Sequence, residues 1–91
     1  MRFEWAEAKA AANRQKNGVS FEEACTLFED LLYIIFADPD HSEAENRFII
    51  LGVSVNGRLI VVSFAERPDS TRLISAREAT RSERELYEED H

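Results

Sequence analysis

Arginine side chains are concentrated near the end of this 91-residue chain. Residues 71–87 carry four of them, Arg72, Arg77, Arg81 and Arg84, although the whole chain has a net charge of −7. A guanidinium stays protonated, and its planar fork binds phosphate oxygens at two points. The cluster therefore indicates a site for an anion. The alternative is that these arginines pair with neighbouring glutamates along a solvated helix, as residues four apart commonly do.

The composition limits the class of protein. Ninety-one residues, 44% of them hydrophobic, are enough for one core, so we expect residues 1–91 to form a single domain. The one cysteine, Cys25, has no partner for an internal disulfide, and no apolar run reaches the roughly 20 residues that cross a bilayer. We therefore expect a cytoplasmic protein without membrane contact. The net charge argues against loose, charge-driven binding to nucleic acid.

No metal or cofactor is expected. The loop that contains Asp38, Asp40, His41 and Glu43 is rich in carboxylates, but no second ligand cluster follows at a recognisable spacing. With three glycines in the chain there is also no glycine-rich phosphate loop. The site, if it is catalytic, must use side chains alone.

The elements that position the arginines begin with a short strand and a helix. Phe3 and Trp5 alternate with charged residues, which is typical of a strand. The run AEAKAAANRQKN is rich in helix-forming residues and is followed by Gly18, so it predicts a helix over about residues 6–17.

A second helix is predicted over about residues 21–30. Ser20 and Glu23 have the spacing of a capping box, in which the serine hydroxyl accepts from the Glu23 amide and the glutamate reaches back. Phe21 and Phe28 lie on one apolar face of this helix.

The middle of the chain predicts a meander of four strands. The continuous apolar run LLYIIFA indicates a buried strand. Asn56-Gly57 between two β-branched runs is the strongest hairpin signal, because both residues accept the positive φ of a type I′ turn. The predicted strands are 31–37, 47–55, 58–66 and 71–76.

A closing helix follows the last strand. Two capping boxes compete for its start, Ser75 with Glu78 and Thr80 with Glu83, and the strand-like alternation through Ser75 favours Thr80. The predicted fold is α+β, with a short N-terminal strand, two helices, a four-stranded antiparallel sheet and a C-terminal helix. Such a sheet buries one face and leaves the other partly open.

Five stretches of the sequence resemble the BrnT toxin family, with similarity over nearly the whole chain. They are Phe3–Trp5, Asn13–Ala24, Pro39–Glu43, Glu45–Arg47 and Ile74–Tyr87. The resemblance implies a RelE-like fold and the ribonuclease toxin of a type II toxin–antitoxin system, which cleaves RNA and inhibits translation. It also implies a BrnA-like antitoxin with a ribbon-helix-helix domain, which masks the toxin. In such a complex the antitoxin binds DNA, and the toxin is linked to DNA only through the antitoxin. We expect two toxins on one antitoxin dimer.

The resemblance suggests roles for the cationic side chains. RNA cleavage without a metal needs a base for the 2′-hydroxyl, a cation for the phosphorane and an acid for the leaving oxygen. Arg72, Arg77 and Arg81 are the candidates for holding the phosphate, and Lys16 is the candidate proton-transfer group. From spacing alone, Lys16 could instead complement the dipole at the end of its helix.

Four further residues are candidate RNA contacts: Trp5, His41, Arg47 and Tyr87. The aromatic rings could stack on bases, although each could equally belong to the core. His41 could act as a general acid or be a solvated turn residue.

The sequence also differs from the family where positive charge is common, at Asn17, Glu78 and Ser82, and Ala6 replaces a frequent aspartate. These differences favour an alternative function, a catalytically weak or inactive module that binds an antitoxin or the ribosome without cleaving RNA.

Overall fold

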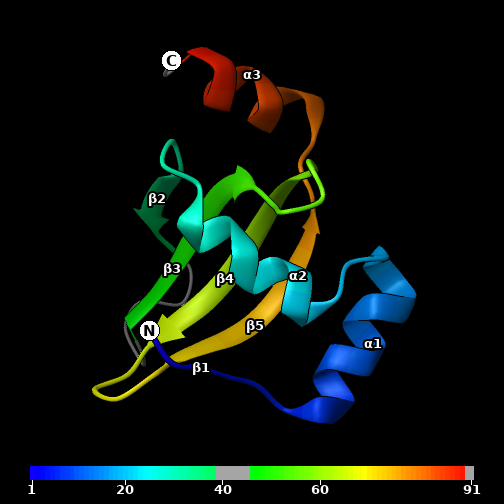
Figure 1. The fold of residues 1–91 in the computed structure, drawn as a ribbon, viewed down its shortest axis with the longest axis vertical. Helices are drawn as coiled ribbons and strands as arrows, with labels where there is room; N and C mark the ends of the chain where they lie inside the picture. Colours follow the sequence, from blue (N-terminus) through cyan, green and yellow to red (C-terminus); the bar gives the residue numbers. More distant parts are fainter. Residues whose placement is uncertain (39–45, 90–91) are drawn as a thin grey trace.

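The computed structural model describes residues 1–38 and 46–89, and in it three α-helices surround one five-stranded sheet (Figure 1). The predicted α+β class is confirmed. In chain order the elements are β1 (Phe3–Glu4), α1 (Glu7–Asn17), α2 (Phe21–Thr26), a 3₁₀ turn η1 (Leu27–Glu29), β2 (Ile34–Ala37), β3 (Asn46–Val53), β4 (Leu59–Glu66), β5 (Thr71–Glu78) and α3 (Arg81–Glu89).

The sheet has the order β1-β5-β4-β3-β2. Strands β2 to β5 form the predicted antiparallel meander, and β1 joins it in parallel beside the start of β5. The backbone amide of Thr71 donates to the carbonyl of Arg2 at 2.7 Å, which anchors this pairing. The sheet is therefore five-stranded and mixed, whereas the sequence predicted four strands with the N-terminal strand apart from them.

The main core lies between the sheet and the layer of α1 and α2. Phe21 of α2 and Phe64 of β4 are almost completely buried there, and Phe28 contacts Phe64 edge-on with ring centroids 5.1 Å apart. A second cluster of apolar residues, Leu51, Leu59 and Val61, is covered in part by α3. The two clusters lie on opposite faces of the sheet, because successive strand residues point to opposite sides.

The apolar run at residues 31–37 does not form the predicted buried strand. The strand β2 begins only at Ile34 and lies at the end of the sheet, where it pairs with β3 alone. Leu31 is 97% exposed and Phe36 is 43% exposed. An edge position leaves side chains on both faces of β2 in contact with solvent, which the apolar composition did not indicate.

The helix ends follow the predicted signals in most details. Gly18 ends α1 with a φ of 69°, and the hydroxyl of Ser20 accepts from the amide of Glu23 at 3.0 Å. The carboxylate of Glu23 does not reach back to Ser20 as the capping box predicted, because it binds Arg58 instead.

The predicted hairpin between β3 and β4 is confirmed, but its turn is not type I′. Gly57 has a φ of 79°, and in the described parts of the chain no other type of residue has a positive φ. A type I′ turn needs positive φ at both central residues, so Asn56 excludes it. The turn closes through the amide of Gly57, which donates to the carbonyl of Ser54 at 2.9 Å.

Candidate functional site

Arg72 and Arg77 lie on the same face of β5, although five positions separate them. Directly opposed residues of antiparallel strands point to one side, and Arg72 is opposite Ala65 while Arg77 is opposite Val61. Ala65 and Val61 are four apart in the unbroken β4, so they share a face. A register shift in β5 supplies the extra residue that brings the two arginines together, and such bulges often lie beside functional sites.

This face of the sheet is the one turned away from α1 and α2. Val61 belongs to the second apolar cluster, not to the core beneath the helices. Arg47 of β3 is also opposite Ala65, so Arg47 and Arg72 flank the same small residue on the same side. We call the side of the sheet with Arg47, Arg72 and Arg77 the open face.

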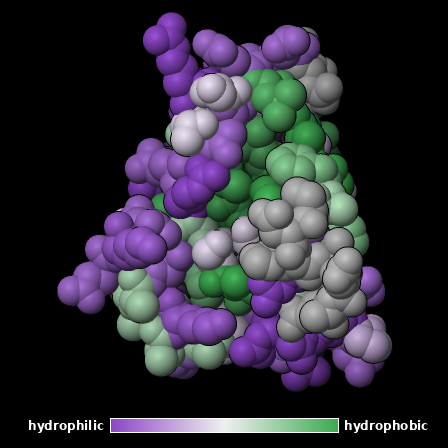
Figure 2. All heavy atoms as spheres, turned by 180° about the vertical axis from the view of Figure 1, so that it is seen from behind, coloured by the Kyte–Doolittle hydropathy of each residue, from purple (hydrophilic) through white to green (hydrophobic). Residues whose placement is uncertain are grey.

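Figure 2 shows the molecule from this side. Hydrophobic residues gather toward β2, β3 and the underside of α3, while hydrophilic residues dominate toward α1 and the β5 edge. The open face therefore combines an apolar part with a polar, arginine-bearing part. That combination suits a ligand with both phosphates and bases.

The guanidinium of Arg77 is held by Glu83 of α3. Nη1 donates to Oε1 at 2.7 Å and Nη2 to Oε2 at 2.8 Å, a two-point contact. The hydrogen bonds from Arg77 lower the pKa of Glu83 to about 2, and the same contact raises the pKa of Arg77. Thus Arg77 lies on the open face and is already paired with a carboxylate, which is the arrangement that the alternative interpretation of the arginine cluster predicted.

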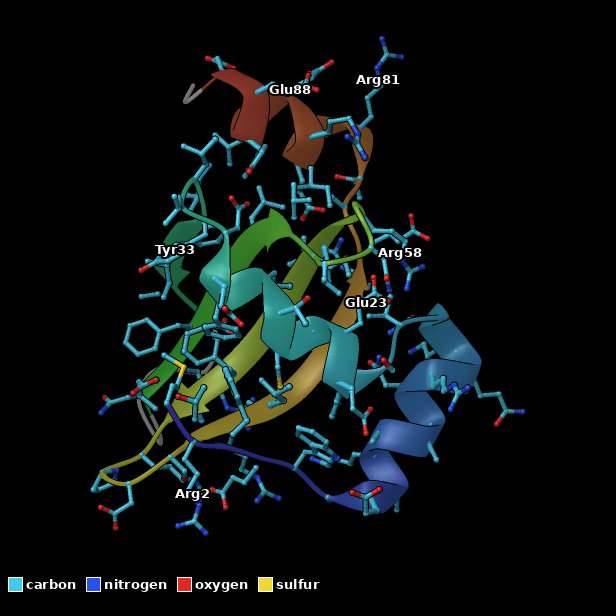
Figure 3. The ribbon with its side chains drawn as sticks, viewed as in Figure 1. Arg2, Glu23, Tyr33, Arg58, Arg81 and Glu88 are labelled. Carbon is cyan, nitrogen blue, oxygen red and sulfur yellow. The ribbon has the colours of Figure 1, made fainter. Side chains whose placement is uncertain are left out.

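Arg72 and Arg81 differ sharply from Arg77. Arg72 is half-buried on β5, and within residues 1–38 and 46–89 no carboxylate is paired with it. Arg81 is 93% exposed at the start of α3, where its Nε lies 3.5 Å from Oε1 of Glu85. Figure 3 shows Arg81 pointing away from the sheet. The structure therefore brings Arg72 and Arg77 to one face and leaves Arg81 outside it.

Lys16 is exposed in the last turn of α1, and two asparagines fix that helix against β5. The side chain of Asn13 donates to the carbonyl of Ala76 at 2.8 Å and accepts from its amide at 3.1 Å. Asn17 donates to the same carbonyl at 3.1 Å. The helix thus covers the β5 edge as a neighbouring strand would.

Helix geometry decides the side of α1 on which Lys16 lies. At about 100° per residue, Lys16 and Arg14 lie on opposite flanks of the Asn13 direction. Arg14 lines a hollow of about 160 Å³ together with Phe21 in the helix layer. Lys16 is therefore on the flank of α1 that is turned away from this hollow, and its position beside Arg72 and Arg77 stays a prediction.

The two aromatic residues that were predicted to contact RNA pack against opposite faces of the sheet. Trp5 lies beside the main core, and Tyr87 lies beside the second apolar cluster. Trp5 packs edge-on against Phe21 at 5.8 Å, and its indole donates to Glu7 at 3.0 Å. The hydroxyl of Tyr87 donates to Asp30 at 2.6 Å, and burial followed by this contact raises the pKa of Tyr87 to about 12. RNA contact by these rings stays a prediction, and His41 lies outside the described residues.

The sequence did not reveal the residues that position the arginines. Glu83 was recognised as a helix cap, and the cap is present: its carboxylate accepts from the Thr80 amide at 2.8 Å, and the Thr80 hydroxyl accepts from the Glu83 amide at 3.2 Å. Its second contact, to Arg77, has no local signal. Asn13 and Asn17 likewise act over about 60 positions of sequence, as the contacts to Ala76 show.

A partly buried ion pair joins Glu23, in the first turn of α2, to Arg58, which directly precedes β4. Arg58 Nε donates to Glu23 Oε2 at 3.0 Å, and the hydroxyl of Ser54 donates to the same oxygen at 2.7 Å. Chiefly through the bond from Arg58, the pKa of Glu23 falls to about 2. Glu78, one of the positions that differ from the family, also contacts Arg58 at 3.3 Å. These charges hold the β3–β4 hairpin against α2.

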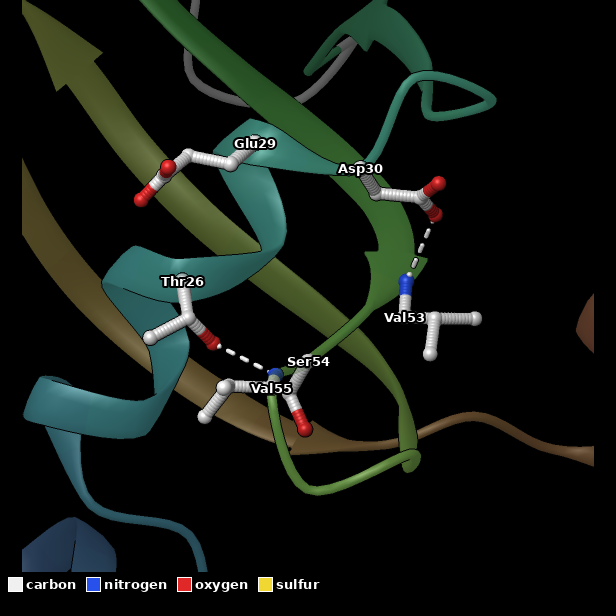
Figure 4. Close-up of a pocket in the computed structure, with 6 residues that line it drawn as sticks. All are labelled: Thr26, Glu29, Asp30, Val53, Ser54 and Val55. Atoms are coloured by element: carbon white, nitrogen blue, oxygen red, sulfur yellow. Dashed lines mark hydrogen bonds between the residues drawn. The ribbon is translucent and has the colours of Figure 1, made fainter.

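A hollow of about 330 Å³ lies beside this hairpin, and polar side chains that line it are hydrogen-bonded to backbone groups of the protein (Figure 4). The Thr26 hydroxyl accepts from the amide of Val55 at 2.9 Å, and Asp30 accepts from the amide of Val53 at 2.8 Å. Both bonds join residues that line the hollow, so its polar groups anchor the end of β3.

Two properties concern the described residues as a whole. None of the helices there is both long and apolar enough to cross a membrane. No three His, Cys, Asp or Glu side chains among them are grouped so that they could hold a metal ion.

Comparison with known proteins adds independent information. A family model described as "Ribonuclease toxin, BrnT, of type II toxin-antitoxin system" matches residues 5–83. The 1.1 Å crystal structure of the Brucella abortus ribonuclease toxin, BrnT, is similar with a TM-score of 0.72 and 25% sequence identity, over 89% of this chain and 99% of that one. A search of curated proteins found no match.

Proposed function

Because this chain belongs to the BrnT family of ribonuclease toxins of type II toxin–antitoxin systems, we propose that it cleaves RNA at the open face of its sheet. The family predicted from the sequence motifs is confirmed by this match. The observation that carries the proposal is the bulge in β5, which puts Arg72 and Arg77 on one side of the sheet with Arg47.

The proposed reaction is metal-independent. The 2′-hydroxyl of the RNA attacks the adjacent phosphorus, the 5′-oxygen of the next nucleotide leaves, and a 2′,3′-cyclic phosphate is formed. Arg72 and Arg77 bind the phosphate and stabilise the negative charge that develops on its oxygens. Lys16, in its neutral form, accepts the 2′-hydroxyl proton, or in its charged form donates to the leaving oxygen.

The remaining candidates bind RNA at a distance from the reacting phosphate. Arg47 sits beside Arg72 across Ala65, which suits a neighbouring phosphate. Arg81, at the exposed start of α3, would contact a phosphate farther along the strand. With messenger RNA as its substrate, the protein would act in the cytoplasm as a messenger RNA interferase, and its activity would inhibit translation.

The proposed partner is a BrnA-like antitoxin with a ribbon-helix-helix domain. Because such domains are dimers, the complex would hold two toxins on one antitoxin dimer, and only the antitoxin would contact DNA. Binding of the antitoxin would keep RNA from the open face.

One observation favours a second candidate function. The bidentate Arg77–Glu83 pair occupies the guanidinium that the reaction needs. If Glu83 keeps this position in the presence of RNA, the protein binds its antitoxin or the ribosome without cleaving.

The test is incubation of the purified chain, free of antitoxin, with messenger RNA in the presence of EDTA. We expect fragments that end in 2′,3′-cyclic phosphate. Arg72→Ala and Arg77→Ala should lose cleavage by at least about a hundredfold while Arg84→Ala, an exposed arginine of α3, keeps it. Intact RNA at micromolar wild-type protein, with circular dichroism showing the fold, would contradict the nuclease and leave the binding module.

A further inference from the structure

Two serines lie between Arg72 and Arg77 on the open face. Ser75 of β5 is directly opposite Ser63 of β4, and the two strands run side by side (Figure 1). In β4, Ser63 lies midway between the residues opposite Arg72 and Arg77, and positions two apart in a strand share a face. We call Ser63 and Ser75 the serine pair. It occupies the centre of the arginine-bearing part of the sheet, on strands that the structure describes in full.

The bulge in β5 is what turns Ser75 to this side. Leu73 belongs to the main core, and in a regular strand Ser75, two positions later, would point into that core as well. Leu73 and Ser75 are instead opposite neighbouring residues of β4, so Ile74 is the extra residue of the bulge. The irregularity that brings Arg77 to the open face therefore brings a hydroxyl there too.

The hydroxyls of the serine pair do not hold the fold together. The hydroxyls of Ser20, Ser54 and Ser70 all form hydrogen bonds with other groups of the protein. Those of the serine pair form none within residues 1–38 and 46–89, not even with each other, although hydroxyls opposed across two strands often do. No side-chain oxygen of the described residues is fully buried without a partner, so both hydroxyls reach solvent.

The serine pair supplies donors where the sheet has few others. Backbone N–H groups lie in the plane of a sheet and bind neighbouring strands, so a face offers only side-chain donors. Among residues 73–76 of β5 and 62–64 of β4, the serine pair alone has polar side chains. A serine hydroxyl donates one hydrogen bond, and a bond to a charged oxygen is stronger than a bond between neutral groups.

From this arrangement we propose that the serine pair binds the scissile phosphate of RNA, each hydroxyl donating a hydrogen bond to a non-bridging oxygen. The scissile character of this phosphate rests on the proposed function. Arg72 and Arg77 hold the phosphate from the two ends of the row, and the serine pair holds it from the sheet beneath. Donors fixed on a rigid sheet position the phosphorus and need no rearrangement as charge develops.

The neighbouring strand limits where the phosphate can lie. On its β3 side Ser63 is opposite Ile49, which packs against the second apolar cluster. A phosphate displaced toward β3 would exchange hydroxyl donors for an aliphatic side chain and lose its hydrogen bonds. The serine pair therefore fixes the phosphate over β4 and β5, between the two arginines.

The test compares threonine with valine at each position of the pair. The two side chains have nearly the same shape and both suit a strand, but only threonine has a hydroxyl. Ser63→Thr, Ser63→Val, Ser75→Thr and Ser75→Val are made in the complete chain, and thermal unfolding verifies the fold of each. Ser82→Ala, which removes an exposed hydroxyl of α3, is the control.

Binding is measured by fluorescence anisotropy with two labelled oligonucleotides that cannot be cleaved. The first is RNA with 2′-fluoro groups in place of the 2′-hydroxyls. The second also has methylphosphonate linkages, in which a methyl group replaces one charged oxygen of each phosphate. Cleavage of the unmodified RNA is measured separately.

We expect each valine variant to bind the first oligonucleotide at least about tenfold more weakly than the threonine variant at the same position, because it lacks a hydrogen bond to a charged group. With the methylphosphonate oligonucleotide this difference should shrink to about twofold or less, since the accepting oxygen is changed. Ser82→Ala should bind as the wild type does. Should the added methyl group exclude RNA from all four variants, Ser63→Ala and Ser75→Ala must bind at least about tenfold more weakly than the wild type.

Equal binding by the threonine and valine variants, where these variants bind, would overturn the inference. A difference that the methylphosphonate oligonucleotide preserves would overturn it too, because the hydroxyls would then contact ribose or base. The binding test needs no cleavage. Hydroxyl-dependent binding by a wild type that leaves RNA intact would refute the proposed activity alone, whereas valine variants that cleave at the wild-type rate would refute the role of the serine pair alone.

Discussion

Glu83 contacts Arg77 and the start of α3 with the same carboxylate. Its Oε1 accepts from Arg77 Nη1 at 2.7 Å and from the amide of Thr80 at 2.8 Å, while Oε2 accepts from Arg77 Nη2 at 2.8 Å. A carboxylate in this position uses the guanidinium donors that a phosphate would use. The cap of α3 and the proposed phosphate site therefore compete for one arginine.

Glu83→Gln separates these two roles. Glutamine still serves in a capping box, so α3 keeps its start, but the charge that holds Arg77 is lost. We expect RNA to bind about two- to fivefold more tightly, since a solvent-exposed ion pair contributes roughly 0.2–1 kcal/mol. Fluorescence anisotropy with a labelled RNA oligonucleotide measures the change.

The matched control for this prediction is Glu85→Gln, which removes a carboxylate next to Arg81 but not next to Arg77. Both variants change the net charge equally. If Glu85→Gln strengthens RNA binding as much as Glu83→Gln does, the effect comes from the overall charge. The proposal that Glu83 competes with phosphate for Arg77 would then be wrong.

Much of the fold was readable from local signals. Gly18, the Ser20 hydroxyl and the Thr80 capping box end or start helices as predicted, because each acts on backbone groups within a few residues. The order of helices and strands could be predicted from the spacing of apolar residues, because this pattern too is a local property of the sequence. The prediction of a type I′ turn was wrong because Asn56 does not have a positive φ. The pair Asn-Gly permits positive φ at both residues but does not require it.

The site was less predictable because it depends on long-range register. In a regular strand, Arg72 and Arg77 would face opposite sides, since their separation is odd. The bulge that reverses this is seen only in the pairing with β4. The exposure of residues 31–37 is a similar case, because position within the sheet, and not composition, decides whether an apolar strand is covered.

The stability of the protein should depend on Glu23 at acidic pH. The pKa of Glu23 is lowered from 4.5 to about 2 in the folded chain, so the unfolded chain takes up a proton first as the pH falls. Stabilisation by Glu23 is therefore complete above pH 4.5 and is lost progressively toward pH 2. Urea unfolding at a series of pH values measures this loss.

Glu23→Gln should remove this part of the pH dependence and lower the free energy of unfolding at neutral pH by roughly 2–4 kcal/mol, because it leaves Arg58 without its buried partner. Glu22→Gln, at an exposed position of the same helix, is the control and should change neither. A Glu23→Gln variant with unchanged acid sensitivity would show that other carboxylates dominate.

Asn13 should be the more important of the two asparagines that hold α1. Asn13→Ala leaves the buried amide of Ala76 without an acceptor and removes donors to two carbonyls, those of Ala76 and Val19. We expect the free energy of unfolding to fall by roughly 2–3 kcal/mol. Asn17→Ala should cost about 1 kcal/mol or less, since Asn13 still donates to the Ala76 carbonyl. Equal losses in the two variants would contradict this ranking, which chemical denaturation can establish.

Tyr87 attaches α3 to the rest of the protein, and its ionisation should report on that attachment. The pKa of Tyr87 is raised from 10 to about 12 by burial and by its bond to Asp30, so the folded chain keeps the proton that the unfolded chain loses. Its contribution to stability is therefore present below pH 10 and is lost as the pH rises toward 12. In a Tyr33→Phe variant Tyr87 is the remaining tyrosine of the two, so tyrosinate absorbance follows it alone. We expect half-ionisation near pH 12, and half-ionisation near pH 10 with an intact circular dichroism spectrum would mean that α3 is detached in solution.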